Sequence, residues 1–71
     1  MRDALTEGEW RVGITFNPSN NEQVEEIKQL TADLIDLIAN TGKDDRSTAL
    51  AQSHYENAAM WAVKSITKQP R

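Results

Sequence analysis

Two long segments of the chain carry apolar residues at every third or fourth position, and only a short polar connector separates them. This spacing predicts two amphipathic helices, over residues 21–41 and 45–68. Gly42 is expected to end the first helix in a left-handed conformation. Because so short a connection places helices side by side in opposite directions, we predict an all-α antiparallel helical hairpin, preceded by an N-terminal arm over residues 1–20.

Each predicted helix has a candidate cap and a candidate buried face. Asn20 or Asn21 is expected to cap the first helix, and Asp44 or Asp45 the second. On the first helix the apolar stripe consists of Val24, Ile27, Leu30, Leu34, Ile35, Leu37 and Ile38. On the second helix the expected face consists of Leu50 or Ala51, Tyr55, Ala58, Trp61, Ala62 and Ile66.

The chain is too short to bury these faces well by itself. At 71 residues it forms one domain, and a single core of this size rarely supplies more than about 3–5 kcal/mol. It has no cysteine and one histidine, which excludes disulfides and the usual structural zinc sites. Burying Trp61 and Tyr55 within two helices is also difficult, so we predict that the chain associates with copies of itself.

Charge and hydropathy exclude several classes of partner. The 8 basic residues are scattered and outnumbered by 11 acidic ones, for a net charge of −3. DNA and RNA polymers require a clustered basic surface and are therefore not expected as partners. No apolar run approaches the roughly 20 residues of a membrane span, and the N-terminus does not read as a signal peptide. We expect a soluble intracellular protein, for which a small anionic ligand is still possible.

The N-terminal arm contains two local patterns. A helical turn is predicted within residues 1–8, because Thr6 and Glu9 match a capping box, although the glycines at positions 8 and 13 argue against a long helix. Val12, Ile14 and Phe16 alternate with other residues, which predicts an extended segment with one buried face. Pro18 then begins a turn that leads into the first long helix.

No sequence motif for catalysis is present. The chain lacks a P-loop, a dinucleotide-binding glycine pattern, a nucleophile elbow and a metal-binding histidine pair. His54 is expected to be a half-buried helical histidine, and Asp33 and Asp36 to lie on a solvated face. We therefore predict a protein that is not an enzyme and that needs no cofactor and no metal.

Phe16 has two readings that the residues alone leave open. It can plug the open end of the hairpin core, or it can offer a flat face on which a nucleobase stacks, worth about 1–3 kcal/mol per base. In the second case Pro18 stiffens the platform and Asn17 reads a base edge. The side chains available for phosphate are Arg11, Lys28, Arg46, Lys64 and Lys68.

Several segments together resemble the small bacteriophage anti-CBASS sponge proteins, whose hairpin domain is shared with an anti-Thoeris sponge. The resemblance spans residues 14–68. It consists of an aromatic-x-Pro arm at residues 16–18, an acidic-Arg connector at Asp45 and Arg46, and a Met-Trp-Ala run at residues 60–62. These elements occur in the family's order and at similar spacing.

The resemblance implies binding without catalysis. Sponges of this family sequester the cyclic di- and trinucleotides that signal infection, in the cytoplasm of the infected host, and assemble as hexamers with pockets between subunits. The aromatic that stacks on a base maps to Phe16. The basic residue of the first helix falls on Thr31, whose hydroxyl can bond a phosphate but adds no charge. Either Lys28, nearly one turn earlier, takes over the role, or the affinity for dinucleotides is reduced. The basic residue ending the second helix aligns near Lys68.

The resulting site prediction consists of Phe16, Asn17, Pro18, Lys28, Thr31, Arg46 and Lys68. The preferred base and linkage stay open. Two other functions also stay open: a structural or partner-binding hairpin with no nucleotide ligand, and a sponge for the cyclised adenosine-diphosphate-ribose signals of Thoeris.

Overall fold

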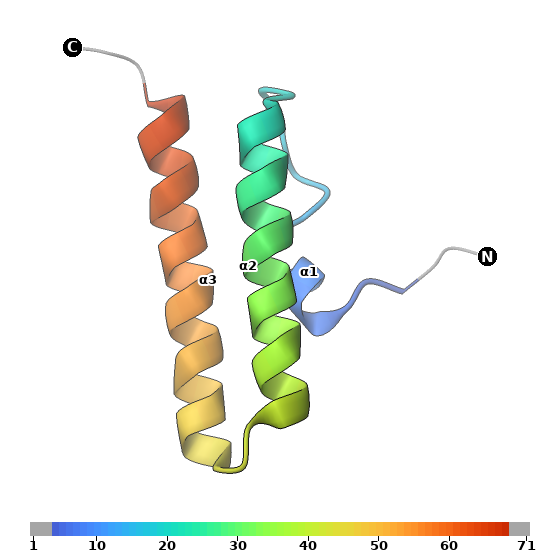
Figure 1. Cartoon of the computed structure of the whole chain (residues 1–71). Helices are drawn as coiled ribbons and strands as arrows, with labels where there is room; N and C mark the ends of the chain where they lie inside the picture. The colour runs from blue at the N-terminus through green and yellow to red at the C-terminus, as the bar shows by residue number, and fades with distance from the viewer. Residues whose placement is uncertain (1–3, 69–71) are drawn as a thin grey trace.

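The computed structural model describes residues 4–68 and contains three helices within them. They are α1 (Glu7–Val12), α2 (Glu22–Thr41) and α3 (Asp45–Thr67). Figure 1 shows α2 and α3 side by side and antiparallel, with α1 against α2. The predicted all-α hairpin is confirmed, and its long helices begin and end within one residue of the ranges 21–41 and 45–68.

Polar side chains start both long helices. Asn21 caps α2, and its side-chain oxygen accepts the backbone N–H groups of Gln23 and Val24 at 2.7 and 3.3 Å. Asp44 caps α3 by accepting the N–H of Ser47 at 2.7 Å. Of the candidate caps, Asn21 and not Asn20 caps α2, and Asp44 and not Asp45 caps α3. Each accepts amide N–H groups that have no partner within the helix.

Gly42 ends α2 for a reason other than the predicted one. Its φ of −68° and ψ of 138° are extended, so the expected left-handed conformation is wrong. A Cβ at this position would instead overlap with the side chain of Thr48 and crowd the carbonyl of Ile38. Gly42 thus gives the tight connector room between the two helices.

The core of the hairpin is small. Val24, Ala32, Ile35 and Ala59 are its buried apolar residues, and two polar residues, Lys28 and Gln52, are buried among them. Gln52 donates to the carbonyl oxygen of Ile35 at 3.4 Å, which gives its amide a partner between α2 and α3. So few buried side chains provide little hydrophobic stabilisation.

The predicted helix faces are only partly correct. On α2, Val24 and Ile35 are buried, but Leu30, Leu34 and Leu37 are 59, 44 and 57% exposed. On α3, Tyr55, Ala51 and Ala62 are half-buried, whereas the exposed members of the expected face are Leu50, Ala58, Trp61 and Ile66. The buried face of α2 is rotated about the helix axis relative to the predicted face, because α1 also packs on this helix. The protected side of α2 therefore includes Ala32 and Lys28.

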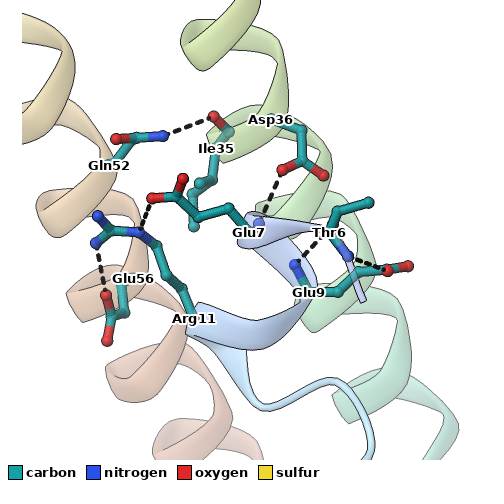
Figure 2. A network of polar contacts seen from close by, with 9 residues as sticks. Thr6, Glu7, Glu9, Arg11, Ile35, Asp36, Gln52 and Glu56 are labelled. Atoms are coloured by element: carbon teal, nitrogen blue, oxygen red, sulfur yellow. Dashed lines mark hydrogen bonds and ion pairs between the residues drawn. The ribbon is translucent and has the colours of Figure 1, made fainter. Parts of the chain in front are cut away.

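Helix α1 is held close to α2 by a glycine. A Cβ on Gly8 would overlap with the backbone of Ala32, so only glycine permits this approach. The N–H of Gly8 donates to Oδ1 of Asp36 at 2.8 Å (Figure 2). Arg11 then joins α1 to α3 through a 3.0 Å ion pair with Glu56.

The ends of α1 follow from local sequence. The predicted capping box is present, with the N–H of Glu9 donating to Thr6 and the N–H of Thr6 donating to Glu9, both at 3.0 Å. At the other end Gly13 has a φ of 65°, and the N–H of Ile14 bonds the carbonyl of Glu9. This left-handed cap turns the chain.

The extended segment predicted for residues 12–16 is therefore wrong. Val12 belongs to α1, residues 13–15 form a turn, and Phe16 is 70% exposed instead of buried. The alternation of apolar residues suggested a strand, but the left-handed glycine reverses the chain before one can form.

None of the helices within residues 4–68 combines the length and the hydropathy that crossing a membrane requires.

The bond between Gly8 and Asp36 can be tested by stability. Asp36→Ala leaves the N–H of Gly8 without its charged acceptor and should lower the free energy of unfolding by about 1–3 kcal/mol. The control is Asp33→Ala, on the exposed side of the same helix, for which a change within about 0.5 kcal/mol is expected. Urea unfolding at matched protein concentration measures both, and equal effects of the two variants would contradict the contact.

The cap at Asp44 predicts a pH dependence. Hydrogen bonding by the side chain and then the backbone of Ser47 lowers the pKa of Asp44. A lowered folded-state pKa means that the charged cap stabilises the fold above the unfolded-state pKa, and that this stabilisation is lost as the pH falls through the folded-state pKa. Asp44→Asn keeps a cap without the charge. Thermal unfolding should place the variant below the wild type at pH 7, with the gap closing in acid; a gap independent of pH would contradict it.

Candidate functional site

A groove of about 640 Å³ lies between the N-terminal arm and the C-terminal half of α3. The arm contributes Trp10, Arg11 and Phe16, α3 contributes Met60 and Val63, and α2 contributes Lys28. Helix α1 forms one wall only because Gly8 allows it to lie on α2. The groove therefore depends on the docking of the arm.

Phe16 is an exposed aromatic on this groove. Its 70% exposure rules out the core plug, which was the first of its two readings. The N–H of Phe16 donates to the carbonyl of Gly13 at 2.9 Å, so the residue closes the turn that follows α1. A ring held by its backbone and left open to solvent is suited to stacking on a planar ligand.

Lys28 is buried beneath the turn that carries Phe16. Its ammonium donates to the carbonyl oxygens of Phe16 and of Gly13, the latter at 3.0 Å. It also lies over the ring of Phe16, at 5.5 Å from the centroid. Burial lowers the pKa of Lys28. The structure thus brings two of the predicted site residues, Phe16 and Lys28, together. The ammonium of Lys28, however, donates to backbone carbonyl groups.

Arg11, the second cation of the groove, is also paired with protein groups. Its guanidinium contacts Glu7 at 2.8 Å and Glu56 at 3.0 Å (Figure 2). The hydrogen bond with Glu7 is the main reason that the pKa of Arg11 lies above its ordinary value. Both cations that line the groove therefore already have partners within the described chain.

Asn17 and Pro18 form the turn before α2. The amide of Asn17 donates to the carbonyl of Asn21 at 2.9 Å, and its oxygen accepts the hydroxyl of Ser19 at 3.0 Å and the N–H of Asn21 at 3.3 Å. Both ends of the amide are engaged locally, and Pro18 is exposed. This arrangement fixes the turn from which Phe16 emerges.

The remaining predicted residues, Thr31, Arg46 and Lys68, do not line the groove. Thr31 is half-buried and its hydroxyl donates to the carbonyl of Ile27 at 2.6 Å. Arg46 is the second residue of α3 and Lys68 follows its end, so about 33 Å along the helix axis separates them. From Arg46 to Met60 is about 20 Å along the same helix. One copy of the chain cannot bring these two cations to one ligand.

Among the groove residues that are absent from the predicted site, Trp10 is the aromatic one. It is 73% exposed and lines the groove together with Phe16. The predicted helical turn covers residues 1–8 and leaves out Trp10, whereas α1 spans Glu7–Val12. Nothing local indicates which way the ring of Trp10 faces. His54, expected to be half-buried, is exposed and does not line the groove.

The other side of the arm is acidic. Glu22, Glu25 and Glu26 line a shallow hollow next to Ile14. Such a surface repels a phosphate-bearing ligand, so the groove lined by Phe16 is the better place for one.

Comparison with known proteins gives one family. The family model described as the Acb2/Tad1 hairpin domain matches residues 9–67, which include α2, α3 and the turn bearing Phe16. No curated protein and no solved structure matches the chain at a significant level. Because the match covers most of the sequence, the chain belongs to the Acb2/Tad1 hairpin-domain family, the family of anti-CBASS and anti-Thoeris sponges.

Proposed function

We propose that this protein is a phage-encoded sponge that binds cyclic di- and trinucleotide immune signals in the host cytoplasm and withholds them from CBASS effectors. The observation that carries the proposal is the exposed ring of Phe16 on a groove, in a chain of a sponge family. A cyclic oligonucleotide offers flat bases to such a ring. Trp10, on the same groove, provides a second aromatic surface.

Sequestration requires no chemical step. The only imidazole, that of His54, is exposed and lies outside the groove. Of the two aspartates expected on a solvated face, Asp33 is exposed and accepts the amide of Gln29, whereas Asp36 is half-buried because it accepts the N–H of Gly8. These positions favour binding over catalysis, so the ligand should be released unchanged.

The phosphates of the ligand need cations that one groove does not leave free. Arg11 is paired with two glutamates, and Lys28 with two carbonyl groups. We therefore propose that the protein acts as a homo-oligomer, a hexamer, in which neighbouring copies bring Arg46 or Lys68 to the ligand. The exposure of Leu30, Leu34 and Leu37 along α2 supports association, because monomers rarely expose such rows.

The function can be tested by calorimetry with a panel of ligands. The panel comprises cyclic di-adenylate, cyclic di-guanylate, the mixed adenylate–guanylate dinucleotide, cyclic tri-adenylate and a cyclised adenosine-diphosphate-ribose. We expect saturable binding of at least one cyclic di- or trinucleotide and full recovery of that nucleotide after denaturation of the protein. Recovery of a cleaved product would indicate an enzyme, and binding of the cyclised ribose alone would indicate a Thoeris sponge.

A matched series at Phe16 tests the stacking platform. Phe16→Ala and Phe16→Leu remove the ring, and each should weaken binding at least tenfold, which corresponds to about 1.4 kcal/mol of stacking. Phe16→Tyr retains the ring and should bind within about threefold of wild type. Calorimetry measures the affinities. Equal affinity of the leucine and tyrosine variants would show that the aromatic face of Phe16 does not contribute to binding.

A second candidate function is a structural hairpin that docks another protein through the same exposed leucines. It is favoured by their exposure but leaves the groove and its aromatic residues without a use. It predicts a monomer or dimer with no heat of nucleotide binding. Sedimentation velocity alongside the calorimetric panel separates the two functions.

A further inference from the structure

We propose that Lys28 is a positioning residue, which holds Phe16 in place for the ligand instead of binding a phosphate. This inference rests on the proposed function, because it concerns how the stacking platform of that function is built. It also differs from the alternative in which Lys28 takes over a family phosphate contact.

The contacts of Lys28 span the whole turn that presents Phe16. Its ammonium donates to the carbonyl of Gly13 at the start of the turn and to the carbonyl of Phe16 at its end. The turn's own bond, from the N–H of Phe16 to the same carbonyl of Gly13, is 2.9 Å long. One side chain from α2 thus ties both ends of the turn to the hairpin.

Burial separates Lys28 from a phosphate in solution. The residue is 7% exposed, and Ala32 and Ile35, four and seven residues further along the same helix, are fully buried on the same face. Both ion pairs within residues 4–68 belong to Arg11, so the charge of Lys28 is balanced by carbonyl dipoles. Moving this ammonium to a ligand would remove the charged donor from both carbonyl groups and leave the carbonyl of Gly13 with the N–H of Phe16 alone. Hydrogen bonds with a charged partner are the stronger ones, so this move is unfavourable.

The ammonium also determines which face of the ring is available. It lies over one face of Phe16 at 5.5 Å from the centroid. A base must therefore stack on the opposite face. Loss of Lys28 removes both the anchor of the turn and the group that blocks the inner face, and the ring is then free to adopt other orientations.

A double-mutant cycle tests this role. The variants are Phe16→Ala, Lys28→Met and the double variant, each titrated with the four cyclic nucleotides of the panel. We expect Phe16→Ala to weaken binding at least tenfold, Lys28→Met at least fivefold, and the double variant no more than twofold beyond Phe16→Ala. Such non-additivity is expected when one residue acts through the other. A loss of affinity in the double variant equal to the product of the two single losses would overturn the proposal.

Salt dependence provides a readout that a general loss of stability does not change. A lysine that neutralises a phosphate contributes to the fall of affinity with salt, whereas a positioning lysine does not. The slope of affinity against salt concentration should be the same for Lys28→Met and wild type. A shallower slope for the variant would assign Lys28 to phosphate and overturn the proposal.

Lys28→Gln keeps two N–H donors without the charge and provides a variant that is easier to fold. Its affinity should lie between those of wild type and Lys28→Met, because part of the anchoring survives. Amide exchange should be faster at Phe16 in both variants and unchanged across α3. An affinity for Lys28→Gln no better than for Lys28→Met, with unchanged exchange at Phe16, would contradict the anchoring role.

The outcomes separate this proposal from the proposed function. If the wild type binds none of the cyclic nucleotides, the sponge function fails, and the positioning role falls with it. If the wild type binds and the cycle is additive, the function stands and only the role of Lys28 is wrong.

Discussion

The close approach of Gly8 to the backbone of Ala32 is the contact on which the rest of the structure depends. Because Gly8 has no side chain, α1 lies directly on α2, and the N–H of Gly8 reaches the carboxylate of Asp36. That position allows Arg11 to reach Glu56 on α3, and it makes the arm one wall of the groove. A hairpin of two helices would have no such groove, so the short first helix defines the candidate site.

Local signals predicted the hairpin well, and contacts between distant residues account for what they missed. The helix caps are local: Asn21, Asp44 and Thr6 each bond to groups no more than four residues away in the sequence. The exposure of Phe16 depends on the left-handed Gly13 and on Lys28, twelve residues away. A buried lysine that serves carbonyl groups has the same sequence signature as a surface lysine, so its role could not be read from the pattern.

The arrangement of charge connects the groove to the need for other copies of the chain. The groove has two exposed aromatic rings, but its cations already serve the fold, and about 33 Å along the helix axis separates Arg46 from Lys68. In the proposed function, a ligand with two or three phosphates is held by aromatic residues of one copy and by cations of its neighbours. Since such a ligand bridges copies, binding should also stabilise the assembly.

The two tryptophans offer the most direct test of where a ligand binds. Trp10 lines the groove, whereas Trp61 is exposed on α3 outside it, so each chain has its own internal control. Their indole N–H signals can be followed by NMR while a cyclic di- or trinucleotide is added. The account predicts that the Trp10 signal shifts with saturation and that the Trp61 signal stays near its starting position. A shift of Trp61 alone, or of neither signal at saturating nucleotide, would contradict it.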